Sequence, residues 1–279
     1  GESAHEAGDE PAAEESTAAR AQGVGPCEDR DLQIPGDPYS PPCVTFDGDN
    51  GGATSQGVTA DTITISARTP DEPGFQDELA NIADADIADT QADVRRTIQA
   101  LVEYVNARFE FYGRELEVVF YDGVGDGMEQ SMGRGQEGAQ ADALTAADEI
   151  GAFVEINGGT EPFGDALARN GVIALGALHF SQEWHEERRP YTWSVLTDCS
   201  TVAQASADWA NVRLRGRQAE HAGDPTLREQ ERLQATVLPD NPVYQQCLAA
   251  AERFARDAGF EPPLAISYTL DIGTMSNQA

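Results

Sequence analysis

Residues 152–162, Ala152-FVEINGGTEP, join an apolar run to a glycine-rich turn and a new start. The apolar run over 152–156 predicts a strand, and the polar turn that follows predicts a helix over 161–169. Strands that alternate with helices form parallel sheets, and loops at the carboxyl ends of such strands are where ligands bind. This stretch therefore predicts both an α/β fold and a candidate binding loop.

The same alternation extends in both directions along the chain. Residues 90–109 predict the clearest helix, with one apolar stripe formed by Val94, Ile98, Leu101, Val102, Val105 and Phe109. A glycine-rich loop at 122–138 leads to a helix through 150, and 176–190 is predicted to be a polar loop. Further strands are predicted at 58–66, 115–121, 172–175, 191–196, 233–238 and 264–269, and further helices at 202–212 and 242–258. We expect parallel sheets with helices on both faces.

Charge and hydropathy exclude several classes of protein. The 279 residues carry a formal net charge of −31, and all 18 basic residues are Arg. Such an acidic surface repels phosphate backbones and anionic lipids, which argues against nucleic-acid or membrane-surface binding. Two interpretations of the acidity stay open, a solubility coat suited to a salty medium and a surface that binds calcium or polycations. No apolar run reaches the roughly 18 residues of a membrane span, and no signal peptide is visible.

Four cysteines, Cys27, Cys43, Cys199 and Cys247, show no CxxC pair and no zinc-type spacing. The segment from Cys27 to Cys43 is rich in Pro and Gly, so the sequence predicts a disulfide between these two and an oxidising compartment. Cys247 falls on the apolar face of a predicted helix. Whether it is a buried thiol or is bonded to Cys199 stays open.

Several segments together resemble the type I periplasmic binding proteins, the Leu/Ile/Val-binding-protein-like solute receptors of ABC transporters. They are Gly57-VTADTITIS, the helix at 90–109, Tyr112-GRELEVVFYDG, Ala152-FVEINGGTEP, Gly171-VIALGALHF, Tyr191-TWSV and Leu233-QATVLPDNPVYQQ. The resemblance covers most of 57–279. It implies two doubly wound lobes that close on a solute, with lobe one at 57–197 and the first part of lobe two at 198–279. Residues 1–56, an acidic disordered leader and a Cys/Pro-rich collar, are similar to those of lipid-anchored members.

The resemblance also implies ligand-binding positions. Carried over by position, these are Gly158, Gly159, Thr160, Gly176, Ala177, His179 and Phe180 in lobe one, and Asp240 and Tyr244 in lobe two. Glycine lets backbone N–H groups approach a ligand closely, and successive N–H groups suit a carboxylate. His179 and Phe180 are bulkier than the small residues of the amino-acid receptors, which argues against an ordinary branched-chain amino acid.

Other motifs have a plainer interpretation beside the functional one. Gly133-RGQE-Gly138 matches GxGxxG, but ten residues separate it from the preceding strand, so it predicts a loop and not a dinucleotide site. Asp47-GDNGG starts like a calcium loop but has Val58 where a Glu is required, so it predicts a turn. For His179 a ligand contact and a solvated loop position are weighed above metal binding. Trp193 and Trp209 are expected in the core and Trp184 at a pocket rim.

Taken together, these observations predict an extracytoplasmic solute-binding protein, and not an enzyme, that delivers a small polar solute to ABC transporter permease subunits. The solute is amino-acid-like or a small carboxylate or amide. We expect no cofactor, no metal and no membrane contact except through a lipid anchor outside this sequence. An extracellular ligand-sensing domain on the same fold is the alternative, and an enzyme is disfavoured because no nucleophile or metal signature occurs. We further expect lobe two to be incomplete, with apolar surface left exposed on its two strands.

Overall fold

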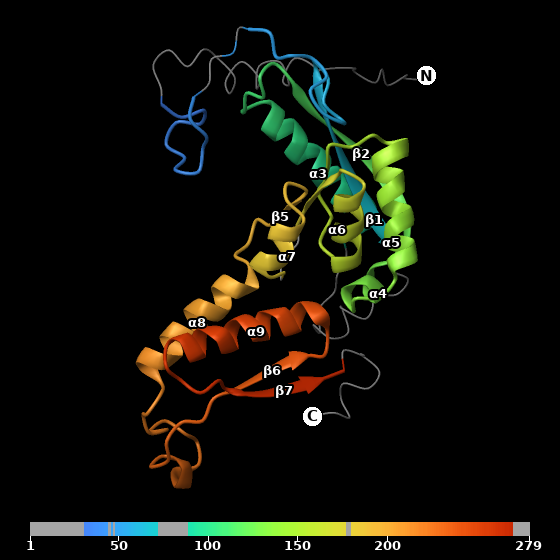
Figure 1. Ribbon diagram of the computed structural model, residues 1–279. Helices are drawn as coiled ribbons and strands as arrows, with labels where there is room; N and C mark the ends of the chain where they lie inside the picture. The colour runs from blue at the N-terminus through green and yellow to red at the C-terminus, as the bar shows by residue number, and fades with distance from the viewer. Residues whose placement is uncertain (1–30, 44–45, 47, 72–88, 177–179, 270–279) are drawn as a thin grey trace, which may run out of the picture.

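The protein forms two α/β units, as shown in Figure 1, a computed structural model that describes residues 31–43, 46, 48–71, 89–176 and 180–269. The first unit contains β1 (Thr62–Asp71), α3 (Gln91–Asn106), β2 (Glu115–Asp126), α4 (Gly127–Ser131), α5 (Gln136–Leu144), the π-helical turn η1 (Thr145–Glu149), β3 (Val154–Glu155), α6 (Glu161–Arg169), β4 (Ile173–Leu175), α7 (Gln182–Glu187) and β5 (Thr192–Trp193). The second contains α8 (Cys199–Arg213), the 3₁₀ turn η2 (Pro225–Leu227), β6 (Ala235–Pro239), α9 (Pro242–Asp257) and β7 (Leu264–Tyr268).

The first unit is built on a five-stranded parallel sheet with strand order β2-β1-β3-β4-β5. This is a doubly wound order in which the chain reverses direction across the sheet between β1 and β3. Ligands of such sheets bind outside the carboxyl ends of the strands at that reversal. The α/β fold with parallel sheets, predicted from the sequence, is therefore confirmed, and it points to the β3–α6 loop quoted above.

Local sequence explains where the main helices begin. Thr90 and Asp93 form a reciprocal capping box at the start of α3, and the hydrogen bonds from Thr90 lower the pKa of Asp93 to about 2. Asn241 accepts a hydrogen bond from the Val243 amide and caps α9, whose first residue is Pro242. The apolar stripe of α3 is only partly covered, because Val102 is buried while Leu101 is 57% exposed.

The core of the first unit lies between α5, α6 and β4 and consists largely of small side chains around Phe163 and Leu167. Small residues let α5 approach β2 closely. At the closest point a Cβ on Gly138 would lie 2.6 Å from the Cα of Gly125. Gly135 adopts φ +69° as the N-cap of α5. The GxGxxG sequence is therefore a packing and turn motif, as its distance from the strand predicts.

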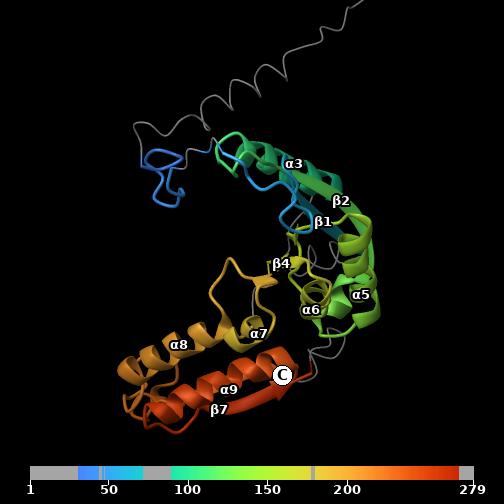
Figure 2. The ribbon, with the colours of Figure 1, turned by 45° about the horizontal axis from the view of Figure 1, so that its top comes forward.

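The second unit is a two-stranded parallel sheet, β6–β7, with α8 and α9 beside it (Figure 2). A disulfide between Cys199 and Cys247 joins α8 to α9, which resolves the alternative left open by the sequence. The apolar side chains of Val237, Leu264 and Ile266 are 63%, 67% and 47% exposed. The exposed apolar surface expected on these strands is thus present in the described residues.

Two short helices differ from the sequence-based expectation. The segments predicted as loops contain α4, capped by Asp126, and α7, capped by Ser181. Both caps are short-range signals that could have been read from the sequence. In the described residues, no helix has the length and apolar character needed to cross a membrane.

The three tryptophans also depart from expectation. Trp184 is 2% exposed and belongs to a buried cluster, whereas Trp193 and Trp209 are 57% and 58% exposed. The predictions of a rim position for Trp184 and core positions for the other two were wrong. Trp184 lies where α7 meets the second unit and is covered by it, while α8 and β5 have few neighbours on their outer faces.

The N-terminal collar is only partly described. Residues 31–43 form a small turn in which the Cys43 amide donates to the Asp31 carbonyl at 2.9 Å. Cys43 is disulfide-bonded. Cys27, its predicted partner, lies outside the described residues, so the pairing stays a prediction. The glycine turn after Asp49 is held by Arg114, which donates to the carbonyls of Asn50 and Gly52.

Candidate functional site

The β3–α6 loop, residues 157–160, lies at the reversal point of the first sheet and is fixed from both sides. The Asn157 side-chain amide donates to the Arg68 carbonyl of β1 at 2.8 Å. Its backbone N–H donates to the Glu155 carboxylate of β3 at 2.9 Å. Because one residue bridges the two strands that flank the reversal, the loop has a defined position relative to the sheet.

A buried charged network supports this loop from below. The Arg68 guanidinium contacts the Asp142 carboxylate at 2.8 Å, and the two side chains are 2% and 3% exposed. The Arg68 backbone N–H and the Ser66 hydroxyl donate to the carboxylate of Glu155. Burial raises the pKa of Glu155, while these hydrogen bonds act in the opposite direction. The Phe163 ring covers the guanidinium at 3.7 Å from its centroid, so water has little access.

The predicted glycines of the site divide into two kinds. The N–H groups of Gly158 and Gly176 donate to the carbonyls of Leu175 and Trp193, so these amides are used within the sheet. A Cβ on Gly158 would lie 2.9 Å from the Cβ of Ala174, which explains the need for glycine there by packing. Gly159 is exposed and a Cβ on it would meet only the Gly176 carbonyl, at 3.3 Å. Of the three, Gly159 is the one that a ligand could approach.

Thr160 is the N-cap residue of α6, but its side chain makes no capping hydrogen bond. The hydroxyl instead donates to Oε1 of Gln130 in α4 at 3.0 Å. The next residue, Glu161, is partly buried, and burial followed by the nearby Asp165 carboxylate raises its pKa. The start of α6 therefore combines backbone N–H donors with the hydroxyl oxygen of Thr160 and the carboxyl group of Glu161 as acceptors.

The second half of the predicted lobe-one set is only partly described. Ala177 and His179 lie outside the described residues. Phe180 is 6% exposed and stacks on Trp184 with ring centroids 4.3 Å apart, and both contact Val243 of α9. The Ser181 hydroxyl donates to the side chain of Gln246 at 2.7 Å. The structure thus places Phe180 in the packing between the two units, whereas the resemblance implies a ligand contact.

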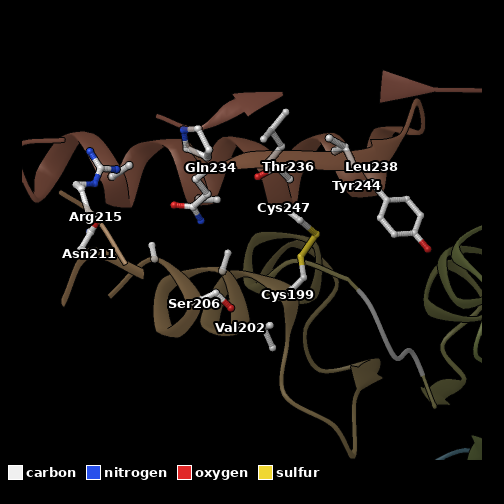
Figure 3. A pocket seen from close by; sticks show the side chains of 16 residues that line it. Cys199, Val202, Ser206, Asn211, Arg215, Gln234, Thr236, Leu238, Tyr244 and Cys247 are labelled. Atoms are coloured by element: carbon white, nitrogen blue, oxygen red, sulfur yellow. A yellow bond between two sulfur atoms is a disulfide. The ribbon is translucent and has the colours of Figure 1, made fainter. Parts of the chain in front are cut away.

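Asp240 and Tyr244 lie on different sides of the β6–α9 turn. Asp240 is exposed, and its N–H donates to the Tyr268 carbonyl at 2.7 Å. Tyr244 lies at one end of a hollow of about 240 Å³ between α8 and α9, with Arg215 at the other end (Figure 3). The Cys199–Cys247 disulfide and apolar side chains form much of the wall of this hollow. Tyr244 is therefore part of the second unit's own packing.

The two units nevertheless meet at the carboxyl edge of both sheets. A Cβ on Gly133, just after α4, would lie 2.7 Å from Nδ2 of Asn241, the residue that follows β6 and Asp240. Gln130, one turn earlier, contacts Thr160. The α4 segment therefore connects the loop after β3 with the turn after β6. Sequence reasoning missed Gln130, Asn241 and the Arg68–Asp142 pair, although the N-cap pattern Asn241-Pro242 is a readable signal.

No metal site is formed in the described part of the chain, where no group of three or more His, Cys, Asp or Glu side chains comes together. His185 contacts the Thr192 hydroxyl through Nδ1 at 3.2 Å, and burial lowers its pKa. His185 is thus a partly buried packing residue of α7.

Comparison with known proteins gives results at the level of structure. No protein-family model matches the sequence, and no curated protein matches it. Solved structures do match. The chain is similar to type I periplasmic binding proteins. An ABC transporter substrate-binding protein from Desulfitobacterium hafniense has a TM-score of 0.46 and 15% identity over 78% of this chain and 54% of that chain.

Two further matches belong to the same class. A periplasmic binding protein from Burkholderia mallei has a TM-score of 0.49 and 14% identity over 78% of this chain and 50% of its own. A solute-binding protein of an ABC transporter from Rhodopseudomonas palustris, solved with 3,4-dihydroxybenzoic acid, has a TM-score of 0.48 and 14% identity over 76% and 48%. The chain thus spans about half the length of the structures that it matches.

Proposed function

We propose that the protein is an extracytoplasmic solute-binding protein that delivers a small polar solute to the permease subunits of an ABC importer. One observation carries the proposal: α4 brings the loop after β3 and the turn after β6 together, so the carboxyl edges of two parallel sheets meet at Thr160, Gln130 and Asn241. Ligands of doubly wound sheets bind at this edge. A solute held there would contact both units, as a clamp requires.

The groups at this edge suit a solute with both donor and acceptor groups. Gly159 and the start of α6 offer backbone N–H groups, and Thr160 and Glu161 offer acceptors. A net charge of −31 disfavours a purely anionic solute. These features support an amino-acid-like solute or a small amide, and they require no cofactor or catalytic group.

The cysteine chemistry supports the location. Cys199 and Cys247 are bonded, and Cys43 takes part in a second disulfide. Stable disulfides form in oxidising compartments outside the cytoplasm. We therefore place the binding reaction in the cell envelope or outside the cell.

Replacing Gly159 by Val should weaken solute binding at least about tenfold while leaving the fold intact. The new side chain would occupy the exposed loop surface where the solute approaches, and its Cβ would need only a small shift from the Gly176 carbonyl at 3.3 Å. Melting temperatures measured with amino acids, amides and short carboxylates would identify the solute, because a ligand that binds the folded state stabilises it. Calorimetric titration then gives the two affinities.

Gly223→Val is the matched control, because a Cβ on Gly223 meets nothing within 4 Å and the residue lies in a distant loop. It should bind like the unsubstituted protein. Equal affinity of the Gly159 variant would show that the site lies elsewhere, and a protein that binds none of the solutes would contradict the proposed function.

A further inference from the structure

Gln130 is a buried polar residue that the fold alone does not explain. Its residue is 1% exposed, and within the described part of the chain its Nε2 atom has no hydrogen-bond partner. A buried amide without a partner costs stability, so its retention at this position requires a reason. The one hydrogen bond that the side chain makes is the bond from the Thr160 hydroxyl to Oε1.

The surroundings fix the orientation of the Gln130 amide. A Cβ on Gly125 would overlap Nε2 of Gln130 and would lie 2.8 Å from the Asp142 carboxylate, so both groups lie against the same glycine. The observed orientation turns the NH₂ group toward the side of the amide near this carboxylate. The opposite orientation would place Oε1 beside the same negative charge, which is unfavourable. Oε1 is therefore the atom that faces Thr160.

The orientation determines what the Thr160 hydroxyl can do. A hydroxyl has one proton, and here that proton is donated to Gln130. The oxygen lone pairs remain available to a ligand, so Thr160 acts as an acceptor at the start of α6. The backbone N–H groups of the same helix end act as donors. Donors and an acceptor thus lie side by side.

We propose that Gln130 is a positioning residue that makes Thr160 a hydrogen-bond acceptor and so selects solutes with an N–H or ammonium group next to their carboxylate. This inference rests on the proposed function. It sharpens the choice between an amino acid and a simple carboxylic acid, because a carboxylic acid that lacks the amino group leaves Thr160 without a donor.

The test uses the full chain and two matched pairs of probes, leucine with 4-methylpentanoate and phenylalanine with 3-phenylpropanoate. The unsubstituted protein should bind an amino acid of a pair at least about tenfold more tightly than the acid without the amino group. Gln130→Met keeps the side-chain length but cannot accept the Thr160 proton. We expect it to lose about tenfold in affinity for the amino acid and to leave the affinity for the acid unchanged.

Thr160→Val should produce the same selective loss, and the double variant should lose no more than either single variant, because both remove one interaction. Removing an amide that lacks a partner should not lower the melting temperature of the ligand-free protein. A merely structural role would lower the affinities for both members of a pair together.

Equal losses for both members, no loss in either single variant, or losses that multiply in the double variant would each overturn the role of Gln130 while leaving the proposed function intact. If the unsubstituted protein binds the acid as tightly as the amino acid, the selection rule is wrong. If it binds no probe and no solute of the wider panel, both the inference and the proposed function are wrong.

Discussion

Replacement of Arg68 by Met is expected to lower the free energy of unfolding by about 3–5 kcal/mol, because it removes one partner of a buried ion pair. The guanidinium is 2% exposed and contacts the Asp142 carboxylate at 2.8 Å. Glu155 lies in the same network with an exposed fraction of 0%. Without Arg68, two buried carboxyl groups would face each other with no positive charge between them.

Urea unfolding followed by circular dichroism measures this loss. Arg96→Met is the matched control, because Arg96 pairs with Asp93 on the surface of α3 and its side chain is 74% exposed. An exposed pair contributes at most about 1 kcal/mol, so the control should change little. Similar small losses in both variants would show that the network is less well shielded from water than the structure indicates.

The structure also predicts a functional consequence of this substitution. The Arg68 carbonyl accepts the hydrogen bond from Asn157, and Glu155 accepts the Asn157 backbone N–H. A shift of the Arg68 backbone would therefore move the loop that carries Gly159 and Thr160. Conditions in which the variant is still folded should show weakened solute binding.

The sequence predicted those elements whose signals are local. The helix predicted at 161–169 has those bounds in the structure, and the one predicted at 242–258 ends one residue earlier, at Asp257. Proline at the first turns, and a cap at Asn241, are local signals that tertiary contacts do not override. The alternation of strands and helices likewise predicted parallel sheets because the connection between parallel strands requires it.

The residues that the sequence did not predict depend on contacts between distant segments. Arg68 and Asp142 are 74 positions apart, and each looks like an ordinary surface charge in its own segment. Gly158 and Gly159 are adjacent and chemically identical, yet one packs on Ala174 and the other is exposed. Only the folded sheet distinguishes them, so the sequence could locate the loop but not the residue that a ligand approaches.

The disulfide between Cys199 and Cys247 should stabilise the second unit by about 4 kcal/mol, the value of the chain-entropy model for a loop of this size. The two cysteines are 48 positions apart in the sequence. The unit that they join has a small core, because α8 exposes Val202, Trp209 and Val212 by 51%, 58% and 69%. With so little buried apolar surface, the covalent link carries a large share of the stability.

Replacing both cysteines by Ala tests this contribution without reducing the disulfide at Cys43. We expect amide hydrogen exchange to increase strongly in α8, α9, β6 and β7, while β2 and α6 of the first unit keep their protection and serve as the internal control. Val243 and Trp184 couple the units through one apolar cluster, so a limited increase in α7 is expected as well. Equal loss of protection in β2 would show that the two units unfold together, and unchanged exchange in α8 would show that packing alone holds the second unit.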